Sequence, residues 1–275
     1  MKIIALSRQI GSWGDEIAAM VAERLGFQLV DQKTVHELAE SCDPGFKDAC
    51  ELYEREAPKG FWERFFFNKP ANTSLFEALN FELASRGDVV LVGRGSQVVL
   101  LNIRGVLRAR IVAPTEVRVK RFAEQHGVPE DKARDYVVRH GQQRRALIQN
   151  IWDVDLSDWA LYDLIVNTQD MTPDDGAYIV ACAAQKMQPV KDEEALKERL
   201  KRLSFAKLVE SAIRKELTGT DLGPITVVSP SQGRVVIAGV VSSEADKLLA
   251  GKIAGQREGV TEVDNQLRVI RAFGV

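Results

Sequence analysis

The sequence predicts an α/β protein in which a doubly wound parallel sheet of five strands is followed by a small αββαβ domain. Short apolar runs alternate with segments of helical periodicity over the first two thirds of the chain, which is typical of a parallel sheet with helices on both faces. Beyond residue 190 the order changes to a long helix, a hairpin, a helix and a strand. The length of 275 residues suffices for two domains with cores of their own.

The first elements form a βαβ pattern. The apolar run at 2–6 predicts a strand, and the loop at 7–14 that follows it contains two glycines. Apolar residues then recur at helical spacing until Gly26, a typical helix terminator. A second strand is expected at 27–30. Because two strands joined by a helix lie parallel, this unit sets the direction of the sheet.

Residues 33–85 are mostly helical in pattern, with proline and glycine interruptions at 43–45, 57–60 and 69–70. An aromatic cluster lies at 61–67. Packing of such aromatics into a core or against a partner is the more common arrangement, and a wall for base stacking is the alternative.

Three further apolar runs, at 88–92, 106–112 and 163–166, predict the remaining strands. The first of them is almost wholly apolar, as suits a strand buried on both faces. Five strands that alternate with helices give a doubly wound sheet. Helices are expected at 116–125, 130–147 and 174–187.

A domain boundary is expected at 189–192. Beyond it, an amphipathic helix carries apolar residues at helical spacing over 196–217. Runs at 225–228 and 235–241, separated by turn residues at 230–233, indicate a hairpin. The order is completed by a helix at 244–256 and a strand at 260–270.

The composition indicates a globular cytoplasmic protein. The formal net charge of -2 gives no overall basic field that would favour nucleic acid. The three cysteines form no Cys-x-x-Cys pair, so neither a disulfide nor a zinc framework is expected. No apolar run reaches the roughly 18 residues of a membrane span, and the first run is too short for a signal-peptide core. His36, His126 and His140 have no metal-ligand spacing, and we expect no protein-held metal.

The loop between the first strand and the first helix is the best candidate for an anion site. Backbone N–H groups converge at such a loop, and the helix dipole favours an anion. Gly11 and Gly14 permit close approach to the backbone. If Gly14 is the second glycine of the pattern G-x-x-x-x-G-K-[ST], Asp15 and Glu16 stand where its Lys and Ser/Thr belong. A tight turn without a ligand is the alternative.

Five short segments carry a more specific pattern. Residues 7–18 read Ser-Arg-Gln-Ile-Gly-Ser-Trp-Gly-Asp-Glu-Ile-Ala, and residues 91–95 read Leu-Val-Gly-Arg-Gly. Residues 162–168 read Tyr-Asp-Leu-Ile-Val-Asn-Thr, while 30–33 and 111–114 read Val-Asp-Gln-Lys and Ile-Val-Ala-Pro. Together these segments, spread over about two thirds of the chain, resemble the cytidylate kinase-like family.

The resemblance implies a nucleoside-monophosphate-kinase fold of the P-loop class over residues 1–190. It also implies transfer of a phosphoryl group from ATP to CMP, dCMP or a related small phosphate acceptor, with Mg²⁺. Arg94 would bind the acceptor phosphate, with Asp31 and Lys33 nearby. The alternative for Arg94 is a surface arginine or a structural ion pair. The nucleotide would bind over Ser7, Arg8, Gln9, Gly11, Ser12, Trp13, Gly14, Asp15 and Glu16.

The arginine-rich helices after Pro114 resemble a lid, at about 115–148, which closes over the phosphates in related kinases. Solvated helix faces with i,i+4 pairs are the alternative for part of these residues. The arginines expected to act in catalysis are Arg94, Arg118, Arg121, Arg139 and Arg145.

Three departures from the family pattern bear on turnover. Gly14 falls where ordinary cytidylate kinases have the phosphate-loop lysine, Trp13 replaces a small residue, and Gln142 stands where an aspartate is frequent. No strand ends in an evident carboxylate for Mg²⁺, and Asp31 is the best candidate. A phosphate-binding site that lacks one charged hydrogen-bond donor can lose about 2.7–4 kcal/mol of transition-state stabilisation. The alternative function is therefore a nucleotide-binding sensor or pseudokinase that signals through the C-terminal module.

Residues 233–241 and 259–267 resemble the BON domain, a small αββαβ module, which we place at 193–275. The resemblance implies phospholipid or ligand binding. Because no export signal accompanies it, we do not expect membrane contact. We expect this domain to form a homo-oligomer or to bind a protein partner.

Overall fold

The computed structural model describes residues 1–30, 69–217 and 225–270. Their contacts divide into two compact units. The first unit comprises the described residues 1–30 and 86–193, and the second comprises those between 69 and 85 and from 194 onward.

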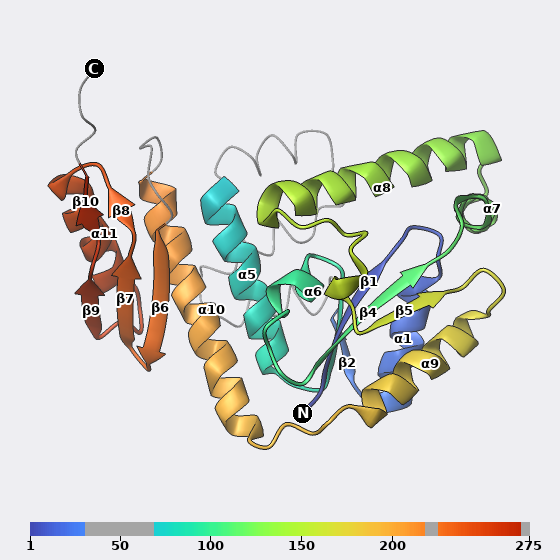
Figure 1. Ribbon diagram of the computed structural model, residues 1–275, viewed down its shortest axis with the longest axis horizontal. Helices are drawn as coiled ribbons and strands as arrows, with labels where there is room; N and C mark the ends of the chain where they lie inside the picture. The colour runs from blue at the N-terminus through green and yellow to red at the C-terminus, as the bar shows by residue number, and fades with distance from the viewer. Residues whose placement is uncertain (31–68, 218–224, 271–275) are drawn as a thin grey trace. The chain divides into compact units, whose positions relative to one another are not determined.

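A parallel five-stranded sheet forms the centre of the first unit (Figure 1). Its strand order is β2–β3–β1–β4–β5, and all four neighbouring pairs are parallel. The parallel α/β architecture expected from the sequence is thereby confirmed. The strands are β1 (Ile3–Arg8), β2 (Gln28–Val30), β3 (Val89–Val92), β4 (Val106–Val112) and β5 (Leu164–Asn167).

Helices α1 (Gly14–Leu25) and α9 (Pro173–Lys186) pack side by side against this sheet (Figure 1). Ile17 of α1 and Val180 of α9 are fully buried in one core with strand residues such as Leu6. Burial of such aliphatic side chains contributes about 1.5–3 kcal/mol each. Both helices begin and end close to the expected residues, and Gly26 ends α1 in the left-handed conformation.

Helices α7 (Thr115–His126) and α8 (Glu130–Trp152) pair through a small core of their own. Val119 of α7 and Val137 of α8 are almost completely buried there. Helix α8 continues beyond the expected end at residue 147 and stops at Asp153, which is left-handed with φ 54°. The unit also contains two short elements that the sequence did not predict, α6 (Ser96–Val99) and the 3₁₀ helix η1 (Trp159–Leu161).

The second unit contains two long helices and two small sheets. Strands β6, β7 and β9 form one sheet, in which β6 and β7 are the expected antiparallel hairpin, and β8 pairs with β10 in the other. The elements are α5 (Lys69–Ser85), α10 (Glu193–Glu216), β6 (Thr226–Ser231), β7 (Arg234–Ala238), β8 (Val240–Val241), α11 (Glu244–Gly255), β9 (Glu262–Asn265) and β10 (Arg268–Val269).

Two strands predicted as continuous are each divided between the two sheets. The run at 235–241 breaks at Gly239, whose φ of 138° no other residue type adopts readily. The run at 260–270 breaks between β9 and β10. Strand β6 also extends to Ser231, so the hairpin turn is shorter than the expected 230–233.

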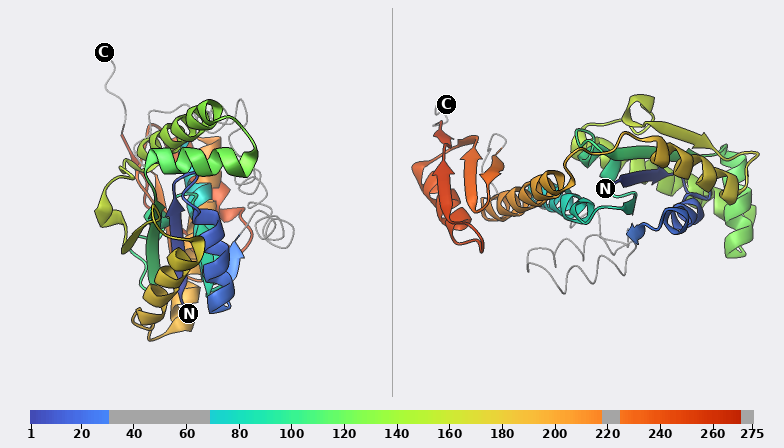
Figure 2. Two further views of the ribbon diagram at one scale, coloured as in Figure 1. Left: turned by 90° about the vertical axis from the view of Figure 1, so that its right-hand side faces the viewer. Right: turned by 90° about the horizontal axis from the view of Figure 1, so that it is seen from below.

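Helix α5 groups with α10 rather than with the sheet that surrounds it in the sequence. The two helices run side by side (Figures 1 and 2) and exchange hydrogen bonds such as that from the Ser204 hydroxyl to the Ala78 carbonyl oxygen, at 2.9 Å. From the sequence, we expected this segment to belong to the kinase-like domain at 1–190. The independent folding of 193–275 stays a prediction.

Glu210 of α10 is fully buried and joins three elements of the second unit. Its carboxylate accepts hydrogen bonds from the Ser74 hydroxyl of α5 at 2.8 Å and from the Val227 N–H of β6 at 3.0 Å. It also pairs with Lys207 and Arg214, both at 3.1 Å. Burial alone would lower the pKa of Lys207, but the charges of Glu77 and Glu210 outweigh it and raise that pKa.

Candidate active site

The loop that joins β1 to α1 is held by contacts with β4 and α7. The buried Ser12 hydroxyl donates to the Gln9 carbonyl oxygen at 2.7 Å. The Gln9 side-chain oxygen accepts from the Ala113 N–H at 3.1 Å. Gly11 has a φ of 76° and lies so close to the main chain of Arg118 that no Cβ would fit. The conformation of the loop is therefore fixed by the protein itself.

Helix α1 starts at this loop without a side-chain cap within the described residues. Its N-cap residue is Trp13, in the left-handed conformation with φ 64°. The first N–H groups of a helix have no intrahelical acceptor, and the helix dipole adds partial positive charge. In the first turn, Asp15 accepts a hydrogen bond from Arg8 Nε at 2.9 Å and Glu16 accepts one from Gln125 at 3.3 Å.

Arg121 of α7 fastens that helix to the loop. Its guanidinium carbon lies 3.3 Å from the ring centroid of Trp13. The guanidinium also donates to the carbonyl oxygens of Thr168 at 2.7 Å and Gln169 at 3.2 Å. Burial lowers the pKa of Arg121, and the charge of Asp170 opposes this shift. Arg121 thus makes structural contacts and does not line the cleft described next.

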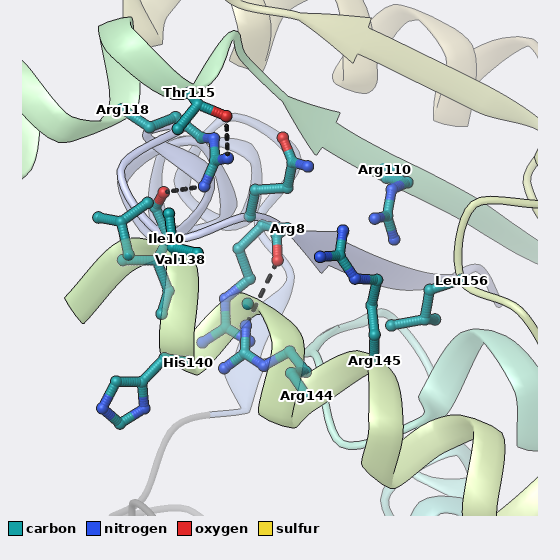
Figure 3. Close-up of a pocket in the computed structure, with 13 residues that line it drawn as sticks. Arg8, Ile10, Arg110, Thr115, Arg118, Val138, His140, Arg144, Arg145 and Leu156 are labelled. Atoms are coloured by element: carbon teal, nitrogen blue, oxygen red, sulfur yellow. Dashed lines mark hydrogen bonds between the residues drawn. The ribbon is translucent and has the colours of Figure 1, made fainter. Parts of the chain in front are cut away.

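A cleft of about 160 Å³ lies between the loop, β4 and the α7–α8 pair (Figure 3). None of the residues that line it is acidic. A recess lined by one sign of charge concentrates ions of the opposite sign. The cleft is therefore suited to an anion with several negative charges. Its arginines are Arg8, Arg110, Arg118, Arg144 and Arg145.

Arg118 is buried at the back of this cleft. It donates to the carbonyl oxygens of Ala113 at 3.0 Å and Ile10 at 3.3 Å, and to the Thr115 hydroxyl at 3.1 Å. No carboxylate of the described chain lies within ion-pair distance of it. Burial, together with the positive charge of Arg145, lowers the pKa of Arg118. A bound anion would relieve the repulsion between these two arginines.

Arg110 of β4 also enters the cleft, although the sequence analysis did not select it. Its Nη1 donates to the Tyr162 hydroxyl at 2.6 Å and to the Ser7 hydroxyl at 3.2 Å. Figure 3 shows its side chain directed toward that of Arg145. The two cations within the otherwise apolar run 106–112, Arg108 and Arg110, are the signal that could have revealed it, since such side chains need a polar environment.

Asp155 lies close enough to these arginines to respond to their charge. Hydrogen bonds from Ser157 are the main cause that lowers the pKa of the Asp155 carboxyl. The positive charges of Arg145 and Arg110 add to the shift. The carboxylate is fully ionised at neutral pH and borders the cationic cleft without lining it.

Arg94 lies in a strained turn at the end of β3. Gly93, Arg94 and Gly95 have φ angles of 72°, 56° and 74°. The two glycines adopt this left-handed region readily, but a non-glycine residue there is uncommon and costs energy. Arg94 is not among the residues that line the cleft.

The cleft therefore brings together four of the residues selected from the sequence: Arg8, Gln9, Arg118 and Arg145. Arg139 lies on the exposed side of α8, outside the lining. Asp31, Lys33 and the aromatic cluster at 61–67 lie outside the described residues.

Comparisons with known proteins match both parts of the chain. Residues 3–170 match the model of the cytidylate kinase-like family. The chain belongs to the cytidylate kinase-like family. Residues 206–271 match the BON domain.

Several proteins named cytidylate kinase resemble the kinase-like part. The cytidylate kinase of Pyrococcus horikoshii is 31% identical over 118 residues, which are 43% of this chain and 60% of that protein. The cytidylate kinase of Pyrococcus furiosus is 30% identical over the same shares. The chain thus spans about 60% of the length of these relatives.

Among solved structures, an uncharacterized protein from Eubacterium ventriosum superimposes with a TM-score of 0.51 at 19% identity. The match covers 68% of this chain and 99% of that protein. At this identity it shows only that the two proteins share a fold. None of the helices in the described part combines the length and apolar character that crossing a membrane requires.

Proposed function

We propose that this protein transfers the γ-phosphoryl group of ATP to a nucleoside monophosphate, of the CMP or dCMP type, or to a related small phosphate acceptor. The observation that carries the proposal is the cleft with five arginines and no acidic residue, beside the loop that opens α1. Phosphoryl transfer depends on positioning and on positive charge around the transferred group. The family membership of residues 3–170 supports the same reaction class.

The reaction requires no covalent intermediate with the protein. The bond between the γ-phosphorus and the bridging oxygen breaks, and its electron pair passes to ADP. A phosphate oxygen of the acceptor, largely deprotonated near neutral pH, forms the new bond. The protein's part is to hold both phosphates in line and to compensate their charge.

We assign the donor phosphates to the loop before α1 and to the cleft. Arg118 and Arg145 would face the transferred group from α7 and α8, and Arg110 would face it from β4. Arg94 would hold the acceptor from the turn after β3, and its left-handed backbone supports a functional role because strain of this kind gathers at binding sites. Arg121 would act indirectly, by holding α7 on Trp13.

Mg²⁺ would accompany the nucleotide. No group of three or more His, Cys, Asp and Glu side chains in the described ranges could hold a metal. Mg²⁺ in kinases is commonly held by substrate phosphates, waters and one or two carboxylates, so no cage made by the protein alone is required. When bound, the ion would neutralise part of the phosphate charge.

The alternative function is a nucleotide-binding sensor or pseudokinase with little turnover, which signals through the BON domain. Gly14 favours it, because a glycine stands where ordinary cytidylate kinases have a lysine. For either function, we also propose that the BON domain forms a homo-oligomer or binds a protein partner, and that the protein is cytoplasmic.

The experiment that separates the two functions counts ADP formed per protein molecule. The purified chain is incubated with ATP, Mg²⁺ and each nucleoside monophosphate in turn, beside an Arg94→Ala variant. We expect ADP that depends on one acceptor and falls when Arg94 is replaced. If the wild-type chain forms no ADP above the background of the same mixture without an acceptor, while ATP still raises its melting temperature, the sensor function is correct and the kinase function is wrong. Equal ADP from two active proteins would refute only the role of Arg94.

A further inference from the structure

Arg8 and Gly14 are neighbours in space at the two ends of the loop. Arg8 is the last residue of β1, and Gly14 is the first residue of α1. A Cβ atom at position 14 would collide with the Arg8 Cβ and lie 2.6 Å from its Cγ. Protein interiors are close-packed and give little room for such an overlap. Only one of the two positions can therefore carry a long side chain.

The spacing of these two residues is that of the phosphate-loop pattern. In G-x-x-x-x-G-K-[ST] the lysine follows the first glycine by six positions. Gly14 follows Arg8 by the same interval, since 14 − 8 = 6. With Gly14 at the lysine position, as in the comparison with ordinary cytidylate kinases, this chain carries a cation where the pattern has its first glycine and a glycine where the pattern has its lysine. The exchange keeps one cation and one glycine at these two positions.

The Arg8 side chain is fixed at the cleft by its neighbours. Its Nε donates to Oδ1 of Asp15 at 2.9 Å, in the first turn of α1. Its Nη1 lies directly against Gly93, so that a Cβ at position 93 would collide with it. The side chain is 19% exposed, and Figure 3 shows it converging with that of Arg144. The guanidinium thus lies between the start of α1 and the turn that carries Arg94.

We propose that Arg8 replaces the phosphate-loop lysine and contacts the transferred phosphoryl group, a role that rests on the kinase function proposed above. Asp15 is then a positioning residue, because it occupies Nε and leaves the outer edge of the guanidinium for phosphate oxygens. A guanidinium binds two oxygens of one phosphate in a fixed geometry, which an ammonium group does not. Gly14 is a consequence of this arrangement, since the space above it is filled by Arg8.

The first test compares Arg8→Met with Arg8→Lys. Both side chains fill the space over Gly14, but only lysine keeps a charge. We expect Arg8→Met to lower kcat about 10²–10³-fold, as the loss of one transition-state donor does, and Arg8→Lys to keep at least about a tenfold advantage over it. Arg24→Met, on the exposed far end of α1, is the matched control and should leave kcat unchanged.

If kcat of Arg8→Met lies within about threefold of the wild-type value, Arg8 does not have the proposed role. The same follows if Arg8→Met and Arg8→Lys lose kcat equally. Neither result would contradict the kinase function itself. An inactive wild-type chain would contradict the kinase function itself and the role of Arg8 with it. Melting temperatures of the variants, measured alongside, identify any loss of folding.

The second test restores the usual pattern with the double variant Arg8→Gly, Gly14→Lys. We expect its kcat to exceed that of Arg8→Gly by about tenfold or more, because the lysine enters the space that Arg8 leaves. Stability gives a readout without turnover: Gly14→Ala should lower the melting temperature in the wild-type chain and much less in Arg8→Gly. The proposed exchange of the two positions would be wrong if Gly14→Ala lowered the melting temperature equally in the two backgrounds. It would also be wrong if the double variant folded but had no higher kcat than Arg8→Gly.

Discussion

The guanidinium of Arg121 stacks on the indole of Trp13, with 3.3 Å between the guanidinium carbon and the ring centroid. This contact joins α7 to the N-cap of α1, where the sequence comparison expected a small residue. Trp13 has a φ of 64°, which costs a non-glycine residue about 1–2 kcal/mol. A cation–π contact contributes about 0.5–2 kcal/mol, so the stack offsets the backbone strain that it accompanies.

Replacement of Trp13 separates these two effects. Trp13→Ala and Trp13→Gly both remove the indole and its contact with Arg121, but only glycine adopts the left-handed backbone without strain. We expect the glycine variant to be more stable than the alanine variant by about 1 kcal/mol in urea unfolding. An alanine variant as stable as the glycine variant would show that the N-cap backbone is not strained.

The pair Arg108–Asp163 predicts a dependence of stability on acid pH. Asp163 accepts from the Arg108 N–H at 2.8 Å and from its Nη2 at 2.6 Å. Burial opposes ionisation of this carboxyl, but the hydrogen bonds and charge of Arg108 outweigh it and lower the pKa below 3.8. A lowered folded-state pKa stabilises the fold above the unfolded value and loses that effect as pH falls through the folded value.

We therefore expect Asp163→Asn to lower the melting temperature at pH 7 and to differ little from the wild type below the folded pKa. Melting curves between pH 7 and pH 2.5 measure this, with the exposed Asp135→Asn as control. A difference between Asp163→Asn and the wild type that stays constant over this range would contradict the ionic origin of the effect.

Among the charged residues that the structure describes in the second unit, Glu210 should be the one whose replacement costs the most stability. It is 0% exposed and has Lys207 and Arg214 as partners. Removal of one member of a buried ion pair leaves the others uncompensated and typically costs about 3–5 kcal/mol. We expect Glu210→Gln to lose about 3 kcal/mol in chemical unfolding, since Lys207 keeps Glu77. The exposed Glu198→Gln on the same helix should change stability by less than about 0.5 kcal/mol.

Two glycines of the α7–α8 pair test backbone conformation alone. Neither Gly141 within α8 nor Gly127 after α7 has an atom within 4 Å of an added Cβ. Gly127 has a φ of 62°, whereas Gly141 is helical. Gly141→Ala should therefore stabilise the protein by up to about 1 kcal/mol, and Gly127→Ala should destabilise it by a similar amount. Shifts of the same sign in the two melting temperatures would refute this account.

The sheet and most helices could be predicted because their signals are local. The apolar run 106–112 is β4 itself, and Gly26 ends α1 as expected. Gly239 divided a predicted strand because one left-handed glycine redirects a chain whose apolar pattern continues. Helix α8 runs past its expected end since its last turns are amphipathic and have no stop signal before Asp153.

The candidate site could be predicted only in part, because charge gathers there from distant segments. Arg8, Arg118 and Arg145 were selected by resemblance to the family. Arg110 and Arg144 were not, although both line the cleft. Arg121 carries the same charge as Arg118, and only its contact with Trp13 shows that it serves α7 rather than the cleft. Sequence alone could not reveal which arginines share one recess.

The central claim is that the arginine cleft binds nucleotide phosphates, and calorimetric titration of ATP tests it most directly. Wild type, Arg110→Met, Arg145→Met and the distant Arg24→Met are compared at one salt concentration with Mg²⁺. We expect each cleft variant to bind ATP about tenfold or more weakly than the wild type, since a charge-assisted hydrogen bond contributes about 1.5–3 kcal/mol. Arg24→Met should bind as the wild type does. ATP that fails to bind, or that binds all four proteins equally, would contradict the claim.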